Sequence, residues 1–102
     1  KILDIIRVEE EEGRYVGYAK EKTEKLAYFY IMSPFNKDKA SIGNGTMISF
    51  DAQTQEKINE IHKKAIELGA INEGDPGPRH GENYYGYFRD LDGNKICVFA
   101  EN

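Results

Sequence analysis

The first half of the chain alternates short apolar runs with polar turns and shows no helical spacing of its apolar residues. Strands are therefore predicted over Lys1–Val8, Arg14–Lys20 and Leu26–Met32. The acidic run Glu9–Glu12 and the polar stretch Glu21–Lys25 read as the turns between them. The third run is apolar at almost every position, which predicts a strand that is buried on both faces.

The second half changes to a helical pattern after one short strand, predicted over Thr46–Phe50. Apolar residues then recur every three or four positions, at Ile58, Ile61, Ala65 and Leu68. The hydroxyl of Thr54 suits the helix N-cap, and Gly69 suits the position that follows a helix. We expect one helix over about Thr54–Leu68, with His62 beside its apolar face in a structural role.

The last twenty residues contain two runs rich in aromatic and β-branched residues, separated by Asp90–Asn94. Gly93 can adopt a positive φ without a Cβ clash, so this stretch predicts a β-hairpin. A five-residue loop pairs Arg89 with Lys95 across the two strands. The same register sets Tyr87 opposite Cys97 and Tyr85 opposite Phe99.

The order of the elements suggests a repeat. From Thr46 onward the order is strand, helix and three strands, with Ala70–Glu73 as a short strand and Gly74–Glu82 as a loop. Three strands without a helix come before it, so we expect one more strand and helix ahead of Lys1. The predicted fold is α+β, with paired βαβββ modules in an open, cupped, mostly antiparallel sheet. A single domain over residues 1–102 then consists of the rest of the first module (1–32), a linker loop (33–45) and a complete second module (46–102).

Composition narrows the class of protein. The chain has 102 residues, 31% of them charged, and a net charge of −4, which argues against nucleic acid as a partner. It contains no apolar run near the ~20 residues that a membrane span needs. A single cysteine forms no internal disulfide and fits a reducing compartment, so we expect a cytoplasmic protein.

The hairpin sequence Phe88–Ile96, preceded by this order of elements, resembles the glyoxalase / bleomycin-resistance / extradiol-dioxygenase superfamily, also called vicinal oxygen chelate proteins. Leu91 stands where the family usually has proline. The glycine-rich stretch Gly43–Gly45 and the segment Pro76–Arg79 also look like one glyoxalase-like branch, so the resemblance covers nearly the whole chain.

The resemblance implies a ligand site on the concave face and, in typical members, a divalent metal held by His and Glu. Met47 stands where the family often has His, and Cys97 stands where it often has Glu. Thioether and thiol suit softer ions such as copper(I) better than hard divalent ions. The favoured interpretation is that both line a pocket without a conventional metal site, so no cofactor is expected. A further ligand would lie on the strand expected before Lys1.

Strand alternation indicates which side chains would share that pocket. The predicted lining consists of Tyr28, Tyr30, Met47, Ser49, Tyr85, Tyr87, Cys97 and Phe99. Arg79 and His80 lie on the loop above it. Arg79 can bind a carboxylate or phosphate, or it can pair with Glu82 or another surface acid. His80 is a candidate base, although a solvated loop residue is the favoured interpretation because no partner is visible.

Three functions remain open at this point. The first is a protein of this family that binds a small organic molecule in an aromatic-lined pocket. The second is a metal-dependent enzyme, a lyase of the lactoylglutathione lyase type or a dioxygenase, with a divalent metal partly held by the preceding segment. The third is a drug-sequestering resistance module that binds between two subunits. Open strand edges also predict a homodimer.

Overall fold

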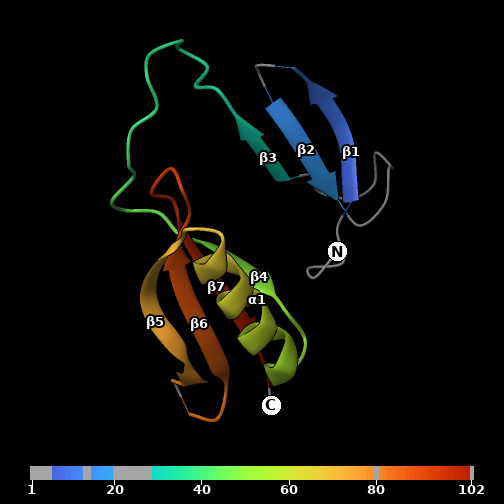
Figure 1. The fold of residues 1–102 in the computed structure, drawn as a ribbon, viewed down its shortest axis with the longest axis vertical. Coiled ribbons are helices and arrows are strands. Elements are labelled where there is room, and N and C mark those ends of the chain that lie inside the picture. Colours follow the sequence, from blue (N-terminus) through green and yellow to red (C-terminus); the bar gives the residue numbers. More distant parts are fainter. Residues whose placement is uncertain (1–5, 13–14, 20–28, 80, 102) are drawn as a thin grey trace. The chain divides into compact units, whose positions relative to one another are not determined.

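The computed structural model describes residues 6–12, 15–19, 29–79 and 81–101. The chain divides into two compact units, Lys1–Ala40 and Ser41–Asn102, each with its own sheet (Figure 1). The division falls inside the segment predicted to be a linker loop. Among the described residues, no helix is long and apolar enough to cross a membrane.

The first unit holds a three-stranded antiparallel sheet. Its strands β1 (Ile6–Glu11), β2 (Tyr15–Ala19) and β3 (Phe29–Met32) follow one another in space in the order β1-β2-β3. The described parts of residues 6–32 contain no helix, as predicted. The acidic run is not a turn throughout, because β1 continues to Glu11 opposite Tyr15. Charged side chains are well tolerated on such an edge strand.

The prediction that the third strand is buried on both faces is wrong for its described part. Tyr30, Ile31 and Met32 are all exposed, Met32 by 49%. Within the described residues, β3 pairs with β2 alone, and no other element of the first unit packs over its faces. Leu26–Tyr28, and with them the predicted site residue Tyr28, lie outside the described residues.

The second unit consists of β4 (Ile48–Asp51), α1 (Gln55–Glu67), β5 (Ile71–Pro78), β6 (Tyr84–Arg89) and β7 (Lys95–Ala100). The sheet has the order β4-β7-β6-β5, with β4 parallel to β7 and the other pairs antiparallel. Helix α1 lies across one face and contacts β5, β6 and β7 (Figure 1). The α+β class and the open sheets agree with the sequence prediction.

The limits of α1 match the predicted ones. The Thr54 hydroxyl accepts a hydrogen bond from the Lys57 amide at 3.1 Å, and Gly69 follows the helix with a φ of +108°. The buried face of the helix holds Ile58, Ile61 and His62. It packs against the sheet side that carries Phe88, Ile96, Val98 and Ala100, which are also buried.

Strand β5 differs from its prediction as a short strand followed by a loop. It runs through both prolines to Pro78, with irregular register on either side of Gly74. Proline lacks an amide hydrogen, but β5 is an edge strand, so Pro76 and Pro78 remove no hydrogen bond on its outer side. Proline and glycine in this segment therefore mark a bulged edge strand.

The closing hairpin has the predicted register, with Arg89 opposite Lys95 and Tyr87 opposite Cys97. One carboxylate oxygen of Asp90 accepts hydrogen bonds from the amides of Asp92 and Asn94, both at 2.9 Å. Gly93 has a φ of +87°, and a Cβ there would lie 2.5 Å from Ile42, so the turn requires glycine.

Candidate binding face

The four-stranded sheet of the second unit has one face toward α1 and one face away from it. A Cβ built on Gly86 would lie 3.3 Å from Ile58 of the helix, which assigns Gly86 and its alternation partners to the covered side. On β4, β6 and β7, the residues that alternate with these point to the other side of the sheet, called here the tyrosine face. It carries Ser49, Tyr85, Tyr87, Cys97 and Phe99.

Three aromatic rings lie together on the tyrosine face. Tyr85 and Tyr87 are parallel, with ring centroids 6.2 Å apart and planes inclined by 5°. Phe99 lies across the strand from Tyr85, at 6.4 Å between centroids. All three side chains are half-buried, so their rings remain partly open to solvent. An apolar ligand can therefore reach this cluster without unfolding the sheet.

Cys97 lies beneath this cluster, with only 1% of its surface exposed. Burial raises the pKa of the Cys97 thiol, while hydrogen bonds from the hydroxyl groups of Ser49 and Tyr87 act in the opposite direction. These three residues face one another across β4, β7 and β6. The thiol is thus neutral at ordinary pH and is a poor nucleophile.

Tyr87 stays protonated as well. Burial and the neighbouring Cys97 raise the pKa of the Tyr87 hydroxyl, and the Arg79 guanidinium partly offsets this. A neutral phenol both donates and accepts a hydrogen bond. On this face the Tyr87 hydroxyl is therefore a neutral polar group beside the aromatic rings.

Arg79 extends over the Tyr87 ring, with its guanidinium carbon 5.4 Å from the ring centroid. Its Nη2 atom donates to the main-chain oxygen of Asp75 at 2.7 Å. The pairing with Glu82 considered from the sequence is not found, and no carboxylate among the described residues forms a salt bridge with Arg79. Gly74 makes this placement possible, because a Cβ there would lie 2.9 Å from both Arg79 and Tyr87.

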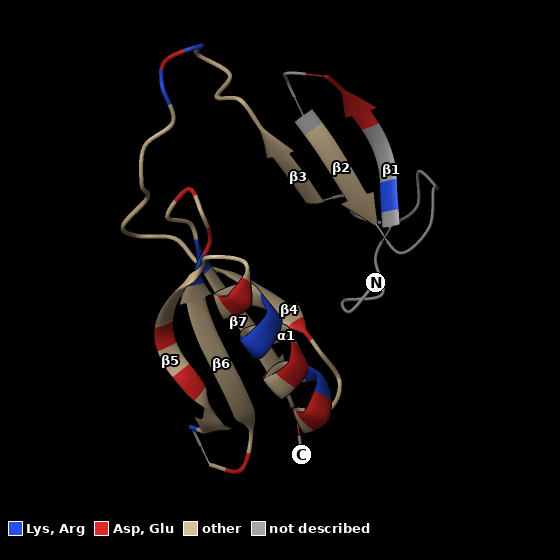
Figure 2. Ribbon diagram, viewed as in Figure 1, with Lys and Arg blue, Asp and Glu red and all other residues tan. Residues whose placement is uncertain are grey.

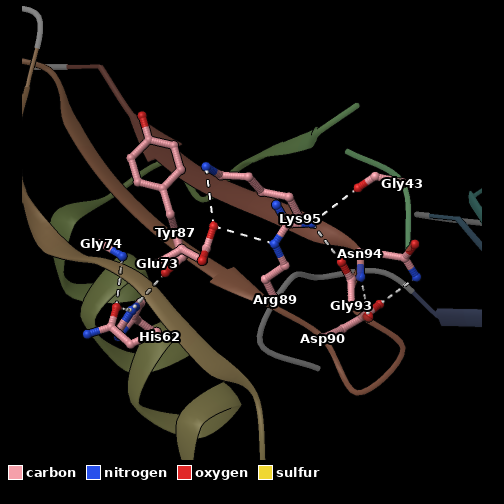
Figure 3. A network of polar contacts seen from close by, with 11 residues as sticks. Gly43, His62, Glu73, Gly74, Tyr87, Arg89, Asp90, Gly93, Asn94 and Lys95 are labelled. Atoms are coloured by element: carbon pink, nitrogen blue, oxygen red, sulfur yellow. Dashed lines mark hydrogen bonds and ion pairs between the residues drawn. The ribbon is translucent and has the colours of Figure 1, made fainter. Parts of the chain in front are cut away.

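A second group of charges flanks Tyr87 on the same face (Figure 3). The Glu73 carboxylate lies 3.4 Å from Nε of Arg89 and 3.5 Å from Nζ of Lys95. The Lys95 ammonium group is also 5.5 Å from the Tyr87 ring centroid. Sequence reasoning missed Glu73 and Lys95 as site residues. Alternation from Cys97 could have placed Lys95 on this face, whereas the position of Glu73 depends on the bulged β5.

His62 supports the tyrosine face from the other side of the sheet. Its Nε2 lies 3.1 Å from Oδ1 of Asn72 and 3.1 Å from the main-chain oxygen of Tyr87. Both partners are acceptors, so Nε2 carries the proton and donates. The same Asn72 oxygen accepts from the Gly74 amide at 2.9 Å. His62 thus links α1 to the bulge that shapes the Arg79 position, in agreement with the structural role predicted for it.

The remaining predicted site residues are more scattered. Met47 precedes β4 and is 46% exposed, and Tyr30 lies on β3 in the first unit. His80 lies outside the described residues. The donors at the two family positions do not suit a hard divalent ion, because one is a thioether and the other a neutral thiol. Within the described residues, no group of three His, Cys, Asp or Glu side chains has the arrangement that a metal ion requires.

Comparison with solved structures gives clear similarities, although no family model and no curated protein matches the chain. A glyoxalase/bleomycin resistance protein from Albidiferax ferrireducens T118 is 31% identical, with a TM-score of 0.83 over 99% of this chain and 79% of that one. Lactoylglutathione lyase from Agrobacterium tumefaciens is 16% identical, with a TM-score of 0.65 over 98% and 78%. The fosfomycin resistance protein FosX from Mesorhizobium loti is 15% identical, with a TM-score of 0.63 over 99% and 75%. For the last two proteins the sequence identity is low, so the similarity concerns the fold alone.

Proposed function

The chain belongs to the glyoxalase/bleomycin resistance family, and we propose that it binds a small organic molecule on the tyrosine face without a conventional metal site. The observation that carries the proposal is the half-buried cluster of Tyr85, Tyr87 and Phe99, with the Arg79 guanidinium beside it. Aromatic side chains give a large contact area at low cost in conformational entropy, and one cation orients a polar group of the ligand.

The test is a binding screen that uses the protein's own fluorescence. The sequence contains seven tyrosines and no tryptophan, and two of them, Tyr85 and Tyr87, lie on this face, so quenching of tyrosine emission includes a contribution from it. We expect small aromatic compounds to quench it at micromolar to millimolar concentration. Replacement of Tyr87 by Leu should weaken binding, whereas the same replacement of Tyr18, on β2 of the first unit, should leave the affinity unchanged. Equal affinity of both variants for every compound would contradict the proposal.

The metal-free part of the proposal rests on the donor set at the two family positions. Burial keeps the Cys97 thiol protonated, and Met47 offers a thioether, so neither attracts magnesium, manganese or iron(II). Metal analysis of full-length protein purified without added ions tests this directly. One equivalent of such a metal would favour the enzyme alternative. The double variant Met47→His, Cys97→Glu should raise the affinity for nickel or manganese if a preceding strand supplies a further ligand.

The alternative function is a metal-dependent lyase or dioxygenase. Lactoylglutathione lyase from Agrobacterium tumefaciens has the same fold, as does a glyoxalase/bleomycin resistance protein/dioxygenase family enzyme from Burkholderia phytofirmans PsJN. Within the described residues this reading lacks a base and a set of metal ligands. Turnover of a substrate that requires an added divalent ion and stops when a chelator is added would favour this alternative.

We also propose a homodimer located in the cytoplasm. Within the described residues, each sheet ends in strands that pair with a neighbouring strand on one side, and a buried free cysteine fits a reducing compartment. A drug-sequestering module that binds between two subunits would need this assembly. Sedimentation that finds only monomer at high micromolar concentration would contradict the dimer and, with it, the resistance-module function.

A further inference from the structure

Positive charge is concentrated around Tyr87, in a chain whose net charge is −4. Arg79 and Lys95 both lie within 5.5 Å of the ring centroid, and Arg89 lies beyond Lys95 on the same face. Among the described residues, the Glu73 carboxylate pairs with Arg89 and Lys95, and no carboxylate pairs with Arg79. In the part of the chain that the structure describes, the tyrosine face therefore has an excess of cations. On α1, by comparison, acidic and basic residues are mixed along the helix (Figure 2).

The cations differ in how firmly they are held. Arg89 donates to the main-chain oxygens of Gly43 at 3.2 Å and Gly93 at 2.8 Å, which commits it to the structure of the hairpin. Lys95 has a contact of 3.5 Å with Glu73, longer than the 2.7–2.9 Å of a strong charge-assisted hydrogen bond. Arg79 uses Nη2 for a main-chain oxygen and has five N–H donors in all. Arg79 and Lys95 are thus the cations that can exchange a partner.

We propose that the ligand class of the tyrosine face is a small aromatic carboxylate, which deepens the proposed function and rests on it. The ligand ring stacks on the Tyr85, Tyr87 and Phe99 cluster, and its carboxylate interacts with Arg79 and Lys95. A neutral aromatic compound would use the rings but leave both cations without a new partner. A planar carboxylate matches the fork of an Arg side chain and adds the ring contact that a bare anion lacks.

Glu73 has a specific role in this proposal, as the resident carboxylate with which the ligand competes. Its contact with Lys95 is made in the absence of ligand, at a side chain that remains about one-third exposed. A ligand carboxylate near Lys95 must therefore overcome repulsion from Glu73. Removal of that charge should strengthen the binding of anions and leave neutral compounds unaffected, a sign opposite to that of most substitutions in a binding site.

The experiment compares benzoate with benzamide, which have similar shape and differ in charge. Titration calorimetry and tyrosine quenching with the full chain should give benzoate about tenfold tighter binding than benzamide, as expected for hydrogen bonds to charged groups. Arg79→Gln and Lys95→Met should each remove most of this difference, and Glu73→Gln should increase it several-fold. Lys63→Gln, an exposed residue on α1, is the control with the same loss of charge. Thermal unfolding of each variant establishes that it is folded.

The outcomes separate this inference from the proposed function. Equal affinities for benzoate and benzamide, or a Glu73→Gln variant that binds benzoate more weakly, would overturn the carboxylate inference and leave an aromatic binding face. If neither benzoate nor benzamide binds but other neutral aromatic compounds do, the carboxylate inference is overturned and the proposed function stands. If no aromatic compound binds, the proposed function fails as well.

Discussion

The two faces of the four-stranded sheet share the same strands but differ in what covers them. The face toward α1 is built from Ile58 and Ile61 of the helix against Val98 and other aliphatic side chains, with Ile58 and Val98 fully buried. The tyrosine face carries half-buried rings, a neutral thiol and a cluster of charges. Alternation along a strand sends neighbouring residues to these two environments, so adjacent positions such as Cys97 and Val98 serve different purposes.

The difference indicates how stability and binding are divided in this unit. Burial of aliphatic surface under α1 stabilises the fold by about 25 cal/mol per Å². The tyrosine face contributes less, because its rings are only partly removed from water. It can therefore vary in sequence without loss of the fold. The following substitutions test this division.

The largest effect is expected from Ile58→Ala on the covered face. Loss of a fully buried Ile should lower the free energy of unfolding by about 2–5 kcal/mol, because a cavity remains between the helix and Gly86. Urea denaturation measures it. Ile66→Ala, on the exposed side of the same helix, is the matched control and should cost much less. Similar losses for both variants would mean that α1 does not pack as described.

His62→Leu should lower the free energy of unfolding by less, about 1–3 kcal/mol, because the main-chain oxygen of Tyr87 loses its buried hydrogen-bond donor. His62→Gln can present an amide N–H in place of Nε2 and should recover part of the stability. The change should also reach the tyrosine face, since Asn72 and the Gly74 bulge lose their link to the helix. A ligand affinity unchanged in the folded Leu variant would show that the two faces are independent.

Gly74→Ala should change binding more than stability. The new Cβ would lie 2.9 Å from the end of the Arg79 side chain, which can move away, and also 2.9 Å from Cδ2 of Tyr87, whose ring must shift. We expect about 1 kcal/mol of destabilisation, together with a loss of the preference for benzoate over benzamide. The control is Gly77→Ala, because a Cβ there would meet nothing within 4 Å. It should leave the stability and the preference for benzoate unchanged.

The smallest effect concerns pH. Burial raises the pKa of the Cys97 thiol above its ordinary value, so the folded state retains the proton more strongly than the unfolded state. Stability should then fall as pH rises through and above the ordinary thiol pKa of about 8.5. Unfolding measured between pH 7 and 10 should show this decline, reduced in Cys97→Ala. The raised pKa of Tyr87 adds a further decline at higher pH. A slope identical in the two proteins would assign the decline to other groups.

Most of the fold follows from local patterns in the sequence. The helix limits could be predicted because Thr54 and Gly69 are local signals, and the hairpin register because Asp90–Asn94 fixes the loop length. Strand β5 could not be predicted, since its prolines are tolerated only by virtue of an edge position that the whole sheet determines. The exposure of β3 escaped prediction for the same reason.

The candidate site could be predicted only in part. Alternation on β6 and β7 placed Tyr85, Tyr87, Cys97 and Phe99 on one face, because the hairpin fixes their register. Glu73 was missed because its approach to Lys95 depends on the pairing of β5 with β6, whose register shifts at Gly74. The Arg79 contact with Tyr87 also depends on that bulge and on the missing Cβ of Gly74. Irregular pairing is a property of three-dimensional packing, and no single residue type signals it.

The two main-chain contacts of Arg89 have a consequence for the kinetics of folding. One acceptor, Gly93, is four residues away and belongs to the hairpin itself, whereas the other, Gly43, is 46 residues away. The near contact can form as soon as the hairpin does, but the far one closes a long loop and waits until β4 and α1 are in place. Contacts formed after the rate-limiting step act mainly on unfolding. The Gly43 contact should therefore slow the opening of the second unit while contributing little to the speed at which it folds.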